Sequence, residues 1–86
     1  MANITKTQIK SKLNDLFERI STIRMELEEL QSDVEMERDD IEPYEGKDDL
    51  TEQQEERQEW LDNTAYTIGE MVDSLNEAED KQYEID

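Results

Sequence analysis

Apolar residues in the first half of the chain recur at alternating steps of four and three residues. The run reads Ile9, Leu13, Leu16, Ile20, Ile23, Leu27, Leu30 and Val34. This spacing places the apolar side chains on one stripe of an α-helix and is typical of a coiled-coil seam. In heptad notation, position a falls on Leu13, Ile20, Leu27, Val34 and Ile41, and position d on Ile9, Leu16, Ile23 and Leu30. Phe17 widens the stripe at position e, and the charged Glu37 interrupts position d.

The stripe predicts a first helix from about residue 5 to about residue 41. Asn3, Thr5 and Thr7 are candidate N-caps, because their side-chain oxygens can accept hydrogen bonds from the free N–H groups of a first turn. Pro43 ends the helix, since proline disfavours helical geometry in the residue before it. Residues 42–49 contain Pro43 and Gly46 and have the composition of a turn.

A second helix is predicted over about residues 50–80, with an alternative start at Thr51, whose spacing to Gln54 matches a capping box. Its seam is weaker than that of the first helix. Apolar or small residues at the seam or beside it are Trp60, Leu61, Ala65, Ile68, Met71, Val72, Leu75 and Ala78. Thr64 occupies a d position, and residues 51–59 contain no apolar side chain. Residues 81–86 are expected to fray.

These elements predict an all-α fold, a single helical-hairpin domain over residues 1–86 with two long antiparallel, coiled-coil-like helices. Two helices alone bury only one face each, so dimerisation into a four-helix bundle is one way to cover the remaining apolar surface. The residues predicted to carry such self-association are Leu13, Leu16, Ile20, Ile23, Leu27 and Leu30.

Charge is distributed unevenly along the chain. The net charge is −17, from 26 acidic and nine basic residues. Residues 1–24 hold five basic and two acidic side chains, for +3, whereas residues 25–86 hold four basic and 24 acidic ones, for −20. In a hairpin, Lys6, Lys10 and Lys12 would face the acidic end of the second helix. Pairing between the helices would then explain why basic residues begin the first helix, against its own dipole.

Several kinds of chemistry are excluded by composition. The chain has neither cysteine nor histidine, so it lacks a thiolate nucleophile and the Glu-x-x-His motif of two-metal bundles. A calcium-hand alignment with Gly46 at loop position 6 fails, because positions 1 and 3 become Ile41 and Pro43. No enzymatic activity, cofactor or metal site is predicted.

Other partners are excluded by charge and hydropathy. A surface at −17 repels nucleic acid, so direct nucleic-acid binding is not expected. No apolar run approaches the roughly 18 residues that a membrane span requires, and the amino-terminal residues lack a secretory signal. We expect no membrane association and a cytoplasmic location.

The dense acidic stretch around the turn has two explanations. It is either a solvated face that keeps a small protein soluble or a surface that imitates phosphates, since duplex DNA carries one charge per about 1.7 Å. On the second explanation, Tyr44 and Trp60 would be the anchors, although Trp60, next to Leu61, could instead pack in a core or a dimer. The predicted partner-binding residues are Glu35, Glu37, Asp39, Asp40, Tyr44, Asp48, Asp49, Glu55, Glu56, Glu59 and Trp60.

In size, composition and predicted shape the chain resembles small phage-encoded inhibitors of host defence, the anti-restriction and anti-CRISPR proteins, several of which are acidic nucleic-acid mimics. The resemblance implies a non-catalytic inhibitor that occupies the basic nucleic-acid-binding site of a host protein. The alternative is a structural or scaffolding coiled-coil module that acts through self-association. An adaptor for a basic partner protein would share the charge pattern of the inhibitor.

Overall fold

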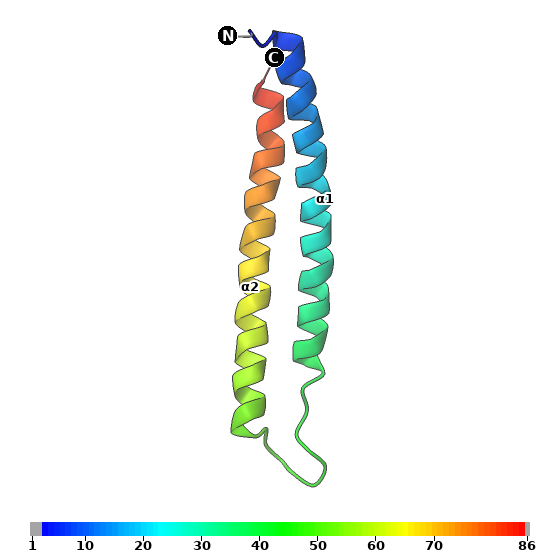
Figure 1. The fold of residues 1–86 in the computed structure, drawn as a ribbon. Helices are drawn as coiled ribbons and strands as arrows, with labels where there is room; N and C mark the ends of the chain where they lie inside the picture. The colour runs from blue at the N-terminus through cyan, green and yellow to red at the C-terminus, as the bar shows by residue number, and fades with distance from the viewer. Residues whose placement is uncertain (1–2, 86) are drawn as a thin grey trace.

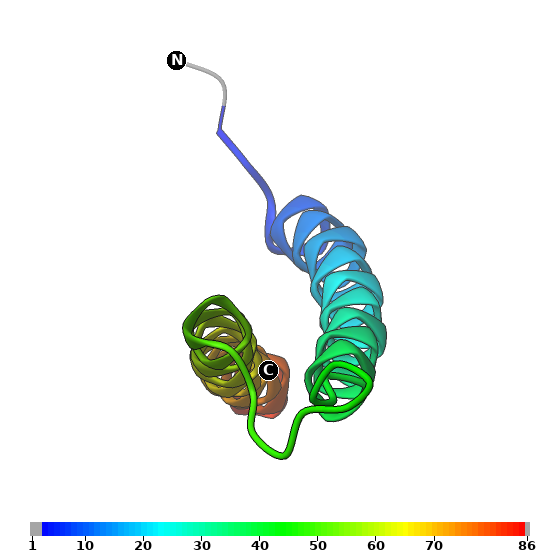
Figure 2. The same cartoon turned by 90° about the horizontal axis from the view of Figure 1, so that it is seen from below.

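The computed structural model describes residues 3–85 and forms a helical hairpin. Helix α1 spans Lys6–Asp39, helix α2 spans Glu52–Asp80, and the short 3-10 helix η1 spans Lys81–Glu84. The two long helices run antiparallel, with the loop at one end and residues 3–5 and η1 at the other (Figure 1). Seen from the loop end, they lie side by side (Figure 2). The prediction of an all-α helical hairpin is confirmed.

Each long helix begins with a reciprocal capping box. The Thr5 hydroxyl accepts from the Gln8 backbone N–H at 3.1 Å, and the Gln8 side chain accepts from the Thr5 N–H at 3.0 Å. Thr51 and Gln54 repeat this pattern at 3.1 and 2.9 Å. Two of the four N–H groups that lack a partner in a first turn are satisfied in this way. Thr5 is therefore the cap among the three candidates, and the alternative start at Thr51 is the correct one.

The loop between the helices is a little longer than the predicted turn. Helix α1 ends at Asp39 with Asp40 as its C-cap, and α2 does not begin until Glu52. Within the loop, the Lys47 N–H donates to the Tyr44 carbonyl at 2.9 Å, and Gly46 adopts a φ of 83°. A type II turn requires this left-handed backbone at its third position, where glycine fits without strain.

At the other end, the chain does not fray directly after α2. Residues Lys81–Glu84 continue as the 3-10 helix η1, where fraying was predicted. Asp86, the last residue of the predicted tail, lies outside the described residues.

The buried core is small and belongs to α2. Leu61, Ala65, Ile68 and Val72 are its buried members, whereas α1 has no buried residue. The α1 side chains that face α2 are half-buried and follow the a and e positions: Leu13, Phe17, Ile20, Arg24, Leu27, Gln31, Val34 and Arg38, with Ile41 continuing the series just beyond the helix. On α2 the facing series is Gln54, Gln58, Leu61, Ala65, Ile68, Val72, Leu75 and Glu79, and Gln82 continues it in η1. Both helices thus use a and e for their mutual contact.

The sequence predicted an a and d seam, and half of that prediction is wrong. The d residues Ile9, Leu16, Ile23 and Leu30 keep 45, 48, 48 and 49% of their surface exposed. Polar contacts at position e account for the difference, because Arg24, Gln31 and Arg38 all bond to α2. Moving from an a/d to an a/e seam turns each helix by about 50° about its axis. The predicted self-association residues accordingly divide into an inner set facing α2 and an outer, exposed set.

The molecule is a rod. It measures 70 × 24 × 15 Å, with a radius of gyration of 20.3 Å. A compact domain of this length would have a radius of gyration of about 12 Å. Neither long helix within residues 3–85 is apolar enough along its length to cross a membrane.

Candidate functional site: the acidic tip

The acidic residues concentrate where α1 ends, the chain turns and α2 begins. We call residues 32–62 the acidic tip. Three contacts fix how its two arms lie together: Arg57 with Glu37 at 3.5 Å, Arg38 with Asp62 at 2.7 Å, and the Gln54 amide donating to the Glu42 carbonyl at 2.8 Å. These contacts bring residues 32–42 alongside residues 52–62.

The charge density of these paired arms approaches that of duplex DNA. Residues 32–42 hold six carboxylates and one arginine, and residues 52–62 hold five carboxylates and one arginine, for a net charge of −9. Residues 52–62 lie in α2, so their ten steps at 1.5 Å cover about 15 Å of the rod. Residues 32–42 reach up to about 20 Å, because α1 ends at Asp39 and the last three steps are not helical. The arms therefore carry one net charge per about 2 Å, which is close to the roughly 1.7 Å of duplex DNA.

Two arginines hold the arms together and neutralise part of this charge. The guanidinium of Arg38 donates to Asp62 and, at 3.1 Å, to Asp39. The hydrogen bond to Asp62, followed by the one to Asp39, raises the pKa of Arg38 above its ordinary value. Arg57 pairs with Glu37. Glu37 and Asp39, two of the predicted partner-binding residues, are thus already engaged within the hairpin.

The other predicted carboxylates are available to a partner. Within residues 3–85 none of them has a basic side chain within 4.0 Å: Glu35, Asp40, Asp48, Asp49, Glu55, Glu56 and Glu59. All are exposed except Glu35, which is half-buried. The sequence prediction omitted Asp33, Glu42, Glu52 and Asp62, which the pairing of the two arms adds to the site. Arg38 could have been anticipated, because it occupies an e position one turn beyond Val34.

The available carboxylates surround the tip and do not lie on one face. Glu35 and Asp40 are separated by about 140° around the axis of α1, and Glu55 and Glu56 by about 100° around α2. A flat basic patch could neutralise only part of such a surface. A channel or cleft that encloses the tip, as it would enclose a nucleic-acid strand or duplex, could neutralise most of it.

Aromatic side chains flank the tip and are open to solvent. Tyr44 is 63% exposed and Trp60 is 64% exposed. The interpretation of Trp60 as a core residue of the hairpin is wrong, because the neighbouring Leu61 takes the buried position and Trp60 is turned about 100° away from it. Apolar contact inside the tip comes from the half-buried Ile41 and Leu50.

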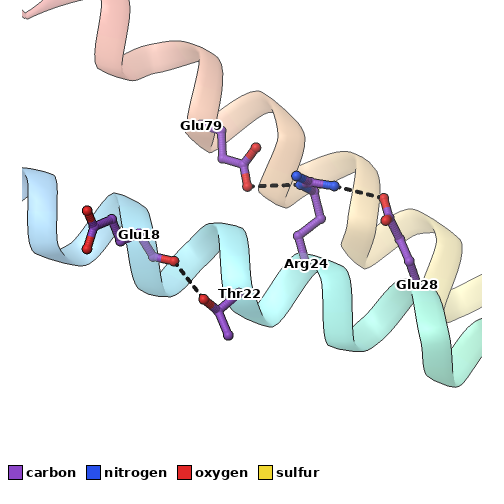
Figure 3. A network of polar contacts seen from close by, with 5 residues as sticks. All are labelled: Glu18, Thr22, Arg24, Glu28 and Glu79. Atoms are coloured by element: carbon purple, nitrogen blue, oxygen red, sulfur yellow. Dashed lines mark hydrogen bonds and ion pairs between the residues drawn. The ribbon is translucent and has the colours of Figure 1, made fainter.

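A separate ion-pair network ties the helices together away from the tip (Figure 3). The guanidinium of Arg24 donates to Glu79 on α2 at 2.9 Å and to Glu28 one turn along α1 at 3.0 Å. Glu79 first, and then Glu28, raise the pKa of Arg24. Next to it on α1, the Thr22 hydroxyl donates to the Glu18 carbonyl within the helix at 3.1 Å (Figure 3).

The predicted pairing of the first-helix lysines is different in the structure. Among the described residues no acidic group lies within 4.0 Å of Lys6, Lys10 or Lys12, and Arg24 makes the contact to the carboxyl end of α2 in their place. The reason is geometric, because Arg24 lies level with Glu79 near the end of α2. Lys6, Lys10 and Lys12 lie about 18 to 27 Å further along α1, beyond the end of α2 at Asp80.

Nothing in the described part of the chain is organised as a metal centre or an enclosed ligand pocket. Within residues 3–85 no three acidic side chains are grouped so that they could hold a metal ion. The hollow around Ile23 is lined by α1 alone, through Asp15, Glu18, Arg19 and Thr22, and is open to solvent. The tip is consequently the region whose chemistry is most distinctive.

Comparison with known protein families, with curated proteins and with solved structures finds no match to this chain.

Proposed function

We propose that this chain is a non-catalytic binding protein whose acidic tip occupies the basic nucleic-acid-binding site of another protein. By holding that site it would inhibit the partner, as inhibitors of the anti-restriction and anti-CRISPR type do. The observation that carries the proposal is the net charge of −9 on the paired arms, spread over about 15 to 20 Å of rod. A site that binds phosphates at one charge per about 1.7 Å meets a comparable density here.

The mechanism is electrostatic competition. Lysine and arginine side chains of the partner would pair with the carboxylates that have no internal partner, such as Asp40, Glu55 and Glu56. Because charge is concentrated at one end of a narrow rod, the field would orient the tip toward a basic channel before contact and accelerate association. Both the rate and the affinity should fall as salt screens these charges.

Electrostatic steering mainly raises the association rate. The additional affinity would come from the exposed aromatic residues. Tyrosine and tryptophan dominate binding hot spots, whereas charges at a rim mainly set the association rate. Tyr44 and Trp60 are exposed within the acidic tip, so they can be buried by a partner without rearrangement of the hairpin.

Two matched variants test the proposal by neutralising four carboxylates each without changing their shape. The tip variant combines Asp40→Asn, Glu55→Gln, Glu56→Gln and Glu59→Gln. The control variant combines Glu70→Gln, Asp73→Asn, Glu77→Gln and Asp80→Asn, which alter exposed positions on α2 outside the tip. Both variants change the net charge from −17 to −13, so only the location of the change differs.

The experiment is capture of proteins from the lysate of the source cell on each immobilised chain, followed by elution with a DNA duplex or RNA. We expect the wild-type and control chains to retain a nucleic-acid-binding protein that the competitor releases. The tip variant should lose it. Equal retention by the tip variant, or a captured protein that nucleic acid does not release, would refute the mimicry.

A further inference from the structure

The exposed d residues form a continuous apolar stripe on one broad face of the hairpin. Ile9, Leu16, Ile23 and Leu30 recur every seven residues, and each is nearly half exposed. The face on the other side of the seam is polar, since position b of α1 carries Asn14, Ser21, Glu28 and Glu35. A chain with a mean hydropathy of −1.11 that nevertheless keeps four large apolar residues in register on one face has a surface suited to burial.

Helix α2 contributes to the same face. The ion pair between Glu37 and Arg57 joins the d position of α1 to the d position of α2, so the d positions of both helices border the same face. On α2 these positions are Thr64, Met71 and Ala78, of which Met71 is 47% exposed. Ile85 lies on the other side of the seam, in a hollow lined by Leu13, Asn14 and Gln82. The apolar surface of this face therefore comes mainly from α1 and from Met71, and it ends at the ion pair, where the acidic tip begins.

We infer that this face binds a second copy of the chain, with the two hairpins packed face to face as an antiparallel four-helix bundle in which α1 lies on α1 of the partner. The stripe from Ile9 to Leu30 is centred between Leu16 and Ile23. A twofold axis at that centre sets Leu16 against Ile23 of the other copy and Ile9 against Leu30.

Charge selects this orientation over the alternative. If the twofold axis ran along the rods, both acidic tips would lie at the same end, in a complex whose two chains carry −17 each. With the axis across the rods, the tips project from opposite ends. Residues 9–19, which hold three basic and two acidic side chains, then lie over residues 20–30 of the other copy, which hold one basic and three acidic ones. Lys12 comes opposite Glu26 of the second copy.

The proposed dimer leaves the acidic tips uncovered. Overlap is confined to about residues 9–30 of α1 and the stretch of α2 alongside them, so the tips extend beyond it on both sides. The complex would be about 90 Å long, compared with 70 Å for one hairpin. This inference does not rest on the proposed function, because it uses the purified chain and a different face.

The first test is the mass in solution, measured by sedimentation velocity over a range of concentrations. The wild-type chain should be a dimer that becomes tighter as salt rises, because salt screens the repulsion between two acidic chains. Leu16→Gln with Ile23→Gln should weaken dimerisation by at least about a hundredfold, since each residue is buried twice. The helical circular dichroism should remain, because both side chains are already half exposed in the single hairpin.

Met25→Gln is the matched control. Met25 lies on the same helix and is 50% exposed, but it falls outside the stripe. This variant should dimerise like the wild type. A wild-type chain that stays monomeric at every concentration would overturn the inference and leave the face to a different partner. So would a Met25→Gln effect equal to that of the double variant.

Cysteine cross-linking tests the orientation, and the chain has no cysteine of its own. Under oxidation, a mixture of Lys12→Cys and Glu26→Cys chains should form a disulfide-linked heterodimer, and neither chain alone should cross-link. Cross-linking of either variant with itself, or none in the mixture, would contradict the antiparallel packing of α1 on α1.

Discussion

At the scale of single residues, the hairpin is specified by polar side chains that lie within an apolar seam. Gln31 shows this most clearly. Its amide reaches across to α2 and donates to the Ala65 carbonyl at 3.1 Å. The same amide occupies the space that a Cβ on residue 69 would need. A Cβ built on Gly69 would be 2.8 Å from the Gln31 amide nitrogen. Gly69 is therefore the complement of Gln31, and the pair fixes the register of the two helices.

The contribution of the contact between Gln31 and Gly69 to the free energy of unfolding can be measured by a double-mutant cycle. Gly69→Ala gains about 1 kcal/mol of helix propensity but displaces the Gln31 amide and loses a hydrogen bond of about 1 kcal/mol, so stability should barely change. In a Gln31→Ala background, the same substitution should raise the free energy of unfolding by about 1 kcal/mol. Urea unfolding followed by circular dichroism, at one fixed chain concentration, gives both values. The same effect in both backgrounds would show that the two residues are not coupled.

Trp60 provides a second prediction at this scale. It is the only tryptophan in the chain and is 64% exposed, outside the overlap of the proposed dimer. Its fluorescence should be readily quenched by acrylamide, and equally so in the Leu16→Gln, Ile23→Gln double variant. Protection of Trp60 in the wild type that disappears in this variant would mean that the dimer covers the tip.

At the scale of elements, the sequence predicts the helices well because the signals are local. Both capping boxes are Thr-x-x-Gln patterns, and the turn signals at Pro43 and Gly46 act on their immediate neighbours. The face that each helix turns inward is not a local property. Apolar spacing favoured an a/d seam on α1, because position e is polar beyond Phe17. The bonds that Arg24, Gln31 and Arg38 make to α2 instead turn position e inward.

The same reasoning explains which parts of the candidate site could be predicted. The acidic composition around the turn was visible in the sequence. The pairing of Glu37 with Arg57 and of Asp62 with Arg38 depends on the register between the helices. The members of these pairs are 20 and 24 positions apart in the sequence, so the pairs cannot be identified until that register is known.

The contribution of the Thr51 cap to stability can be measured separately, because Thr51 caps α2 where residues 52–62 of the acidic tip begin. Thr51→Ala removes the hydroxyl that accepts from Gln54 and should lower the free energy of unfolding by about 1 kcal/mol. Thr67→Ala is the control, since Thr67 lies inside α2 and its hydroxyl bonds only to the Asn63 carbonyl. Alanine is the better helix former, so this control should be neutral or slightly stabilising. A loss at Thr67 as large as that at Thr51 would contradict the capping explanation.

At the scale of the whole molecule, the rod separates two surfaces of opposite character. The acidic tip is charged around its circumference, and the apolar stripe covers one face of the other half. If both proposals hold, two chains join through their stripes and present two tips at opposite ends. The two interactions then respond to salt in opposite directions, since dimerisation is opposed by charge and partner binding depends on it.

The measurement that tests the central claim most directly is the salt dependence of binding between the captured partner and three purified chains. For the wild type and the four-carboxylate control variant, affinity should fall steeply and equally as salt increases, and a DNA duplex should compete in both cases. For the tip variant, affinity at low salt should drop at least about tenfold and the salt dependence should become shallower. If neutralising the tip and the control positions has the same effect, the location of the charge does not matter, and the account of the tip as a nucleic-acid mimic is wrong.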